Sequence, residues 1–188
     1  LPSRYGAIAK AHVQKPNIED NSNSTLDIYV LSYDLNKNLR TPSNALKENL
    51  KTYLNEYKMI GDSLTIKDAF VINIGVDFEI ITLPNYNNNE VLRKCLVALI
   101  NYFNIDEWQI NQPIILRNIN VLLDEIDGVQ TVKKVTITNK TGTTLGYSQY
   151  AYSVEGATLD NVIYPSIDPM VFEVKYPNQD ITGRVVKF

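Results

Sequence analysis

The sequence predicts an α+β fold: a mostly antiparallel or mixed sheet with about three helices packed on it. One long segment, Phe70 to Leu83, alternates apolar and polar residues with period two, as in a strand with one solvated face. Three other segments have apolar residues at three- and four-residue spacing, as in amphipathic helices. The 188 residues, 44% hydrophobic and 21% charged, are typical of a globular protein with its own core.

The first part of the sequence predicts two strands, a loop and a turn. Residues 7–14 (AIAKAHVQ) alternate small or apolar residues with others, which indicates a short strand. The stretch 16–25 is polar and rich in turn-forming residues, so we expect a surface loop there. Residues 26–33 (LDIYVLSY) are mostly β-branched or aromatic and predict a buried strand, and residues 34–40 predict a turn.

A first helix is expected before residue 61. Thr41 can cap its N-terminus, Pro42 suits the first helical position, and Gly61 lies just past its end. The apolar side chains fall on one face at helical spacing: Leu46, Leu50, Tyr53, Leu54 and Tyr57. A short strand is expected to follow at 64–66.

The segment from Phe70 to Leu83 is the strongest predicted strand. Its alternating apolar residues are expected on the core face, whereas Asn73, Asp77 and Glu79 are expected on a partly solvated face. Because this segment is long for a single strand, Gly75 is expected to mark a bulge or bend.

Two further helices and a strand follow. The Asn87–Asn89 run can cap a central helix that ends near Phe103. A third helix is expected to start near Pro113, with proline in its first turn, and to end before Gly128. A strand pattern then resumes over residues 129–138 (VQTVKKVTIT).

From Asn139 onward the helical periodicity stops, and glycines and tyrosines accumulate. Short strands are expected near residues 147–154, 162–164 and 170–176. We therefore expect a β-rich extension and not a second full domain. The predicted organisation has three parts: an opening strand and loop (1–25), an α+β domain (26–140) and the β-rich extension (141–188).

Five tyrosines of the C-terminal part are candidate contact residues for another protein: Tyr147, Tyr150, Tyr152, Tyr164 and Tyr176. Tyrosine combines a large apolar ring with a polar tip and is enriched at protein interfaces. The alternative interpretation is that these rings close the core of the domain itself. A mixed arrangement also fits the pattern, with Phe172 and Val174 inside and Tyr147, Tyr150 and Tyr152 partly exposed.

The sequence has few residues for catalysis or metal binding. His12 is the only histidine and Cys95 the only cysteine, too few for a zinc site or an internal disulfide. Cys95 lies in the most apolar predicted helix, where burial raises the pKa of a thiol. We therefore expect no enzyme activity, no cofactor and no small-molecule substrate.

Two acidic segments resemble cation sites only in part. Residues 34–38 (DLNKN) imitate the start of a calcium loop, but Leu39 stands where glycine is required and Ala45 where a bidentate glutamate is required. A plain turn is therefore expected there. A second acidic cluster, for which a solvated surface is the simpler interpretation and cation binding the alternative, comprises Asp124, Glu125 and Asp127.

The charge balance argues against a nucleic-acid partner. There are 18 basic and 21 acidic residues, a net charge of −3, and the only adjacent basic pairs are Arg93-Lys94 and Lys133-Lys134. The longest apolar run, residues 95–100, is far shorter than the roughly 20 residues of a membrane span, so no membrane partner is expected. No signal peptide is expected, because the sequence does not open on a charged-then-apolar leader, and the opening at Leu1 predicts either a segment cut from a longer polypeptide or a processed terminus.

The order of these elements resembles one known family. From residue 26 to 137 the chain resembles the C-terminal part of the baseplate J-like family, the wedge proteins of contractile phage tails. The most specific features are LKTYLNEYKMIGDSLTIKDAFVINIGV and LLDEIDGVQTVKKVTI, and the leading RYGAIAKAHV is similar to the strand with which the family begins this domain. Four later segments look closer still to the large wedge subunit of T-even-type phages: YNNNEVL, YSQYAYSV, YPSIDPMVFEVKYP and GRVV.

The resemblance implies a structural function. Members of the family pair with copies of themselves and with other wedge proteins to form a ring around the tail hub, and the ring changes geometry when the sheath contracts. It implies a C-terminal fragment of a larger wedge protein, located in the virion and assembled in the host cytoplasm, with no catalytic residues. The alternatives are a baseplate component of a related contractile injection system, and a ligand-binding module or subunit of a cellular enzyme.

Overall fold

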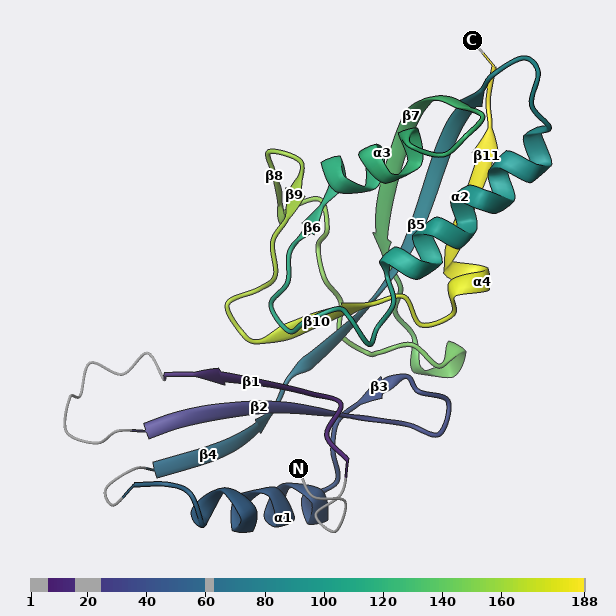
Figure 1. The fold of residues 1–188 in the computed structure, drawn as a ribbon. Coiled ribbons are helices and arrows are strands. Elements are labelled where there is room, and N and C mark those ends of the chain that lie inside the picture. The colour runs from purple at the N-terminus through teal and green to yellow at the C-terminus, as the bar shows by residue number, and fades with distance from the viewer. Residues whose placement is uncertain (1–6, 16–24, 60–62, 188) are drawn as a thin grey trace.

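The fold is built around two mixed sheets that follow one another along a long extended segment (Figure 1). The computed structural model describes residues 7–15, 25–59 and 63–187. These residues form three sheets with three main helices, which confirms the predicted α+β class. Nearly all of the predicted loop at 16–25, and Gly61, lie outside the described residues.

The first sheet contains four strands: β1 (Lys10–Gln14), β2 (Thr25–Tyr33), β3 (Leu39–Arg40) and β4 (Ser63–Asp68). Each of the other three strands pairs with β2. β1 and β3 run antiparallel to β2, and β4 runs parallel to it. Helix α1 (Asn44–Asn55) covers one face, where Leu50 packs with Ile28 and Val30. The strands predicted in these regions are thus confirmed, and β4 is longer than expected.

Helix α1 begins two residues later than the sequence predicts. Ser43, and not Thr41, is the N-cap, because its hydroxyl accepts a hydrogen bond from the backbone N–H of Leu46 at 3.3 Å. Pro42 therefore precedes the helix and is buried. The turn before the helix also differs from expectation, because its last two residues form strand β3 against β2.

The second sheet is arranged around β5 (Phe70–Thr82), which follows β4 after the single residue Ala69. β7 (Val129–Asn139) lies antiparallel on one side of β5. On the other side, β10 (Met170–Glu173) pairs in parallel with the first part of β5, and β11 (Ile181–Val185) pairs in parallel further along. The strands predicted in these regions are confirmed, and β11 is an addition to them.

The first half of β5 is buried on both faces. Asn73, expected on a solvated face, is only 1% exposed, because β10 and the loop at Ser148 pack against that part of the strand. Its side-chain oxygen accepts a hydrogen bond from the backbone N–H of Ser148 at 2.7 Å. Asp77 and Glu79, in the second half, lie on a polar face as the alternation predicts.

The irregularity in β5 does not lie at Gly75. That glycine pairs in register with Thr138. The register shifts instead just after Glu79 and again just after Ile81, opposite the extra residues Lys133 and Gln130 of β7. A Cβ at position 75 would lie 2.4 Å from Cε of Lys140 and 3.2 Å from the backbone oxygen of Asp180, so a side chain there would require the flexible Lys140 side chain to move. The prediction of a bulge at this glycine is therefore wrong, and a bend there stays a prediction.

Two helices cover one face of the second sheet (Figure 1). α2 (Asn88–Tyr102) is capped, as predicted, by Asn87, whose side chain accepts two backbone N–H groups of the first turn. α3 (Leu116–Asp124) is shorter than predicted, because the two residues before it form strand β6 (Ile114–Ile115) and pair with β9 (Val162–Ile163). Pro113 therefore precedes a strand and does not begin the helix.

The segment between β7 and β10 contains little regular structure. Strands β8 (Thr158–Leu159) and β9 (Val162–Ile163) form a small hairpin that joins β6 in the third sheet. The strand expected at 147–154 is not formed, because side-chain hydrogen bonds and ring contacts hold this described segment instead. α4 (Pro177–Asp180) then leads into β11. The division of the chain at residue 140 stays a prediction, although β10 and β11 both pair with β5 across it.

One apolar core connects the two sheets. Leu31 and Leu39 of the first sheet belong to the same buried cluster as Ile74 of β5. The centre of this cluster lies between β5 and the two helices, where Leu99 and Leu123 are fully buried. No described helix is both long enough and apolar enough to cross a membrane.

Candidate functional site

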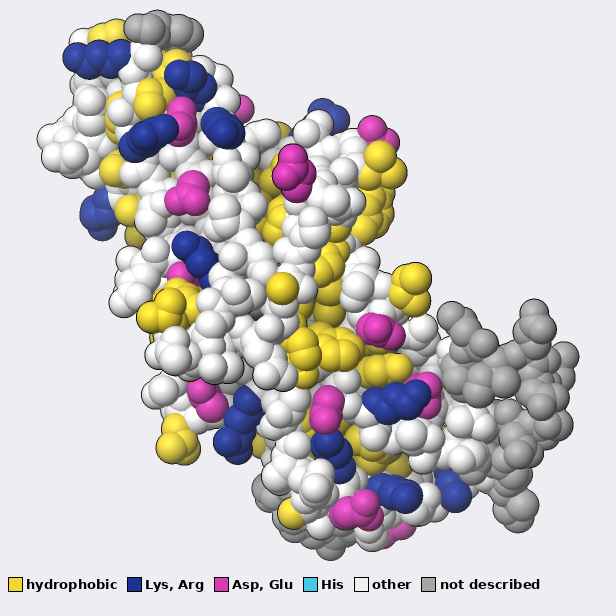
Figure 2. Space-filling view, turned by 180° about the vertical axis from the view of Figure 1, so that it is seen from behind, with side chains coloured by type: hydrophobic (Ala, Val, Ile, Leu, Met, Phe, Trp, Pro, Cys, Tyr) yellow, Lys and Arg dark blue, Asp and Glu magenta, His cyan; other side chains and the backbone are white. Residues whose placement is uncertain are grey.

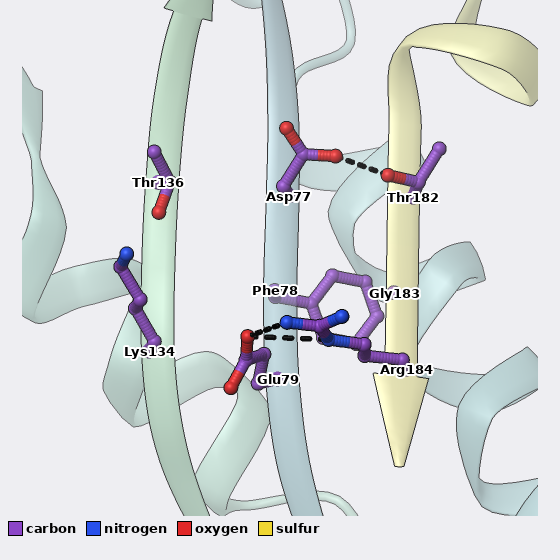
Figure 3. Close-up of a pocket in the computed structure, with 8 residues that line it drawn as sticks. All are labelled: Asp77, Phe78, Glu79, Lys134, Thr136, Thr182, Gly183 and Arg184. Atoms are coloured by element: carbon purple, nitrogen blue, oxygen red, sulfur yellow. Dashed lines mark hydrogen bonds and ion pairs between the residues drawn. The ribbon is translucent and has the colours of Figure 1, made fainter. Parts of the chain in front are cut away.

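The second half of β5, together with β7 and β11, carries a polar groove of about 400 Å³ (Figure 3). The strand register arranges its polar side chains in two rows across the three strands. In Figure 3 these side chains stand on the side of the sheet away from the helices behind it. The two rows are Thr136, Asp77 and Thr182, and Lys134, Glu79 and Arg184.

The second row alternates in charge around Glu79. This carboxylate accepts hydrogen bonds from the guanidinium of Arg184, from Nε at 3.2 Å and from Nη2. Lys134 lies opposite Glu79 on β7, and the register shift places Lys133 beside it. The hydrogen bond from Arg184, and then the positive charges of Arg184 and the two lysines, hold the pKa of Glu79 below its ordinary value.

Both acidic side chains of this surface are already engaged within the chain. Asp77 accepts a hydrogen bond from the hydroxyl of Thr182, and Glu79 is paired with Arg184. Among the described residues, neither Lys133 nor Lys134 has an ion-pair partner. Figure 2 shows Lys and Arg side chains at the end of the molecule that these strands form, and others over the first sheet.

A second polar cluster lies where the two sheets meet. The carboxylate of Glu173, in β10, accepts the backbone N–H of Leu39 and the side-chain N–H of Asn73, both at 2.7 Å. Glu173 is 2% exposed, and this burial raises its pKa above the ordinary value in spite of both hydrogen bonds and the charge of Lys175. The nearby negative charge of Asp34 also raises it.

Two further contacts hold the sheets together at this junction. The hydroxyl of Tyr33, in β2, donates to Asp106 at 2.7 Å. Burial and this hydrogen bond raise the pKa of Tyr33 to about 12. His12, in β1, is half-buried, and its Nε2 lies 3.5 Å from Nδ2 of Asn111. These contacts assign the only histidine a position between the two sheets.

Two of the five candidate tyrosines surround a buried carboxylate. Tyr147 donates its hydroxyl to Asp180 at 2.5 Å, and the backbone N–H of Tyr176 donates to the same carboxylate at 2.9 Å. The two rings lie edge to face with centroids 5.4 Å apart. Burial and the bond to Asp180 raise the pKa of Tyr147 to about 12.

The other three tyrosines lie along the irregular segment and its hairpin. Tyr150 packs edge-on against Phe70 at 4.8 Å, and Tyr152 packs against Phe172 at 5.6 Å. The hydroxyl of Tyr152 donates to the backbone carbonyl of Tyr164, whose side chain is 49% exposed. Of the three arrangements considered, the mixed one is observed: Phe172 and Val174 are buried, and Tyr147, Tyr150 and Tyr152 are partly exposed. A contact with another protein stays a prediction.

Other residues singled out from the sequence are buried in the core or hydrogen-bonded to the backbone. Cys95 is fully buried in α2, and burial raises the pKa of its thiol to about 11. Asp34 accepts the backbone N–H groups of Asn36 and Asn38, which confirms a plain turn. Asp124 accepts the backbone N–H of Val132 at 3.0 Å. Among the described residues, no group of three His, Cys, Asp or Glu side chains is placed to hold a metal ion.

The fold is similar to part of a known baseplate protein. A chain of the "anti-feeding prophage (AFP) baseplate, 6-fold symmetrised", solved by cryo-electron microscopy, superposes with a TM-score of 0.51 at 12% identity over 86% of this chain. The match covers 33% of that chain, so the present chain spans about a third of its length. No protein-family model and no curated protein matches the sequence. The fold is therefore shared with a baseplate chain, while membership of the baseplate J-like family stays a prediction.

Sequence reasoning did not single out the two polar clusters. Asp77 and Glu79 were placed on a polar face, but the partner Arg184 lies 105 residues further along the chain. The local sequence does not predict the burial of Glu173. A single charged residue in a short apolar strand is most simply interpreted as solvent-exposed. The adjacent pair Lys133-Lys134 was the one available indication, and it marks the bulge.

Proposed function

We propose that this chain is a structural, non-catalytic component of the baseplate of a contractile injection machine. The observation that carries the proposal is the fold, which follows a chain of a six-fold baseplate over 86% of the present chain. In a closed symmetric ring each subunit contacts its neighbours through defined surface patches. The function of such a subunit therefore resides in its surfaces and in the rigidity that positions them.

The finer proposal is that the machine is a contractile phage tail. The chain would be the C-terminal part of a wedge subunit, in contact with copies of itself and with other wedge proteins around the tail hub. The sequence segments YNNNEVL and YSQYAYSV support the phage version, whereas the structural similarity supports a related injection system equally well. Its place would be the virion, after assembly in the host cytoplasm.

The polar groove supports a surface role more than a ligand site. Its two carboxylates, Asp77 and Glu79, are each hydrogen-bonded to a side chain of the neighbouring strand. They lie along one face of a sheet and do not converge on an enclosed volume (Figure 3). A ligand site would instead combine an apolar cavity with a few convergent polar groups.

Electron microscopy of tailed particles from the source culture tests the proposal. Intact particles are labelled with a gold-conjugated antibody raised against this chain, and antibody pre-absorbed with the purified chain is the control. The proposal expects label at the end of the tail that carries the baseplate. Label restricted to the host cell fraction, with none on intact particles, would contradict it.

A further inference from the structure

The open face of the second sheet combines an excess of positive charge with exposure. We define this open face as Asp77, Glu79, Lys133, Lys134, Thr136, Thr182 and Arg184. Lys133, Lys134 and Arg184 are exposed, and the side chain of Arg184 retains 72% of its accessible surface. The chain as a whole has a net charge of −3, so this surface opposes the overall charge.

The local pairing leaves the two lysines available. Arg184 satisfies Glu79, and Thr182 satisfies Asp77, so both carboxylates of the face are occupied from the β11 side. The lysines on the β7 side keep their ammonium groups exposed. An ammonium group carries three hydrogen-bond donors and attracts an anionic partner.

The bulge in β7 leaves two adjacent lysines exposed near Glu79. In a regular strand, adjacent side chains point to opposite faces of the sheet. Here Lys134 pairs with Glu79 while Val132 pairs with the next residue of β5, so Lys133 is an extra residue in the ladder. Both lysines act electrostatically on Glu79. Bulges often re-aim a side chain in this way, and lysines at an edge also prevent unwanted strand pairing.

A protein carboxylate fits this surface better than a nucleic acid. A duplex binds by releasing counterions from several phosphates, which needs many well-separated cations. The open face offers three cations beside the two carboxylates of Asp77 and Glu79, and those carboxylates would repel a continuous phosphate backbone. A short acidic protein segment can place individual carboxylates against the lysines and avoid the two acidic positions.

We propose that the open face binds an acidic segment of a neighbouring protein, whose carboxylates contact Lys133 and Lys134. The inference rests on the proposed function, which supplies such neighbours in an assembly. It goes beyond that function by assigning the contact to one face and by naming the charge of the partner. Electrostatic contacts of this kind weaken as salt is added.

A direct binding measurement on the purified chain tests this surface. The probe is a fluorescein-labelled octaglutamate peptide, followed by fluorescence anisotropy at low and at physiological salt. We expect saturable binding at low salt, and the double variant Lys133→Glu/Lys134→Glu should weaken it by about tenfold or more. The matched control, Lys51→Glu/Lys58→Glu, reverses the same number of exposed lysines in helix α1 and just after it, and should change binding by less than about twofold.

The charge reversal also separates binding from edge protection. Glutamates at 133 and 134 would still block strand pairing at this edge. If the lysines only protect the edge, the double variant should therefore bind the peptide no differently from the wild-type chain. Thermal unfolding of both variants, together with the milder Lys133→Gln/Lys134→Gln, checks that the fold is intact. The inference is overturned if the wild-type chain does not bind, if both charge reversals weaken binding equally, or if a short DNA duplex binds the same lysines as tightly as the peptide.

The peptide measurement and the antibody labelling test the two proposals separately. If the peptide does not bind but the antibody labels the baseplate end of the particles, the inference about the open face is wrong and the assembly function stands. If the peptide binds but the chain is absent from particles, the proposed function is wrong and the acidic partner belongs to another assembly.

Discussion

The carboxylate of Glu173, in β10, accepts a hydrogen bond from the backbone N–H of Leu39, in β3, at 2.7 Å, across 134 residues of sequence. Its second oxygen accepts the side chain of Asn73 at the same distance. Since Glu173 is 2% exposed, water cannot easily replace it as the acceptor for either group. One side chain therefore connects the hairpin of the first sheet with two strands of the second.

Replacing Glu173 with alanine should destabilise the protein. The backbone N–H of Leu39 and the side chain of Asn73 would each lose a buried acceptor. We expect the free energy of unfolding to fall by about 2–4 kcal/mol, measured by urea denaturation at neutral pH. A loss below about 0.5 kcal/mol would show that the junction does not depend on this carboxylate.

The same carboxylate should give a pH dependence of defined sign. Burial raises the pKa of Glu173 above the ordinary value of 4.5, so the folded state binds its proton more tightly than the unfolded state does. The part of its contribution to stability that depends on protonation is therefore present below pH 4.5 and is lost as the pH rises through the raised pKa. We expect the free energy of unfolding of the wild type, minus that of Glu173→Gln, to decrease over this range. An increase with pH would contradict the assignment.

Gly183 should not tolerate a side chain. It pairs with Phe78 across β11 and β5, and a Cβ at Gly183 would lie 2.2 Å from Cζ of that ring. The ring is buried, so Gly183→Ala should cost about 1–3 kcal/mol by overpacking. Adding Phe78→Leu to Gly183→Ala should recover part of this loss, which a double-mutant cycle by thermal unfolding measures. Fully additive effects would show that the two positions do not interact.

Tyr147 should stabilise the isolated chain, whether or not it also contacts another protein. Tyr147→Phe removes the hydroxyl that donates to Asp180, a carboxylate that is 3% exposed. We expect a loss of about 1–3 kcal/mol in the isolated chain, measured by thermal unfolding. Tyr164→Phe is the matched control, because Tyr164 is 49% exposed and takes part in the bond with Tyr152 through its backbone carbonyl. Equal stabilities of both variants would favour an interface role alone.

Local patterns predicted the elements whose signals are local. The alternation of β5 and the cap of α2 at Asn87 both appear in the structure, because each depends on residues close in sequence. Two wrong predictions concern helix starts, where more than one nearby residue could cap or begin the helix. Ser43 caps α1 although Thr41 is also a capping residue, and Ile114–Ile115 pair with β9 although Pro113 suits a helix start.

Long-range pairing accounts for what sequence reasoning missed. Asn73 has the position of a solvated residue in the alternation, but β10 arrives from a hundred residues later and buries it. β11 likewise joins β5 in parallel and supplies Arg184 to Glu79. Neither pairing follows from the local pattern of either strand, because the connection between them is long and irregular.

Copy number in purified particles tests the assembly function most directly. Quantitative mass spectrometry, with isotope-labelled peptides of this chain and of the tail sheath as standards, gives the number of copies per tailed particle. A closed six-fold ring requires a multiple of six copies, and that is the result we expect. Intact, contraction-competent particles without this chain, or with a number unrelated to six, would contradict a structural role in the baseplate.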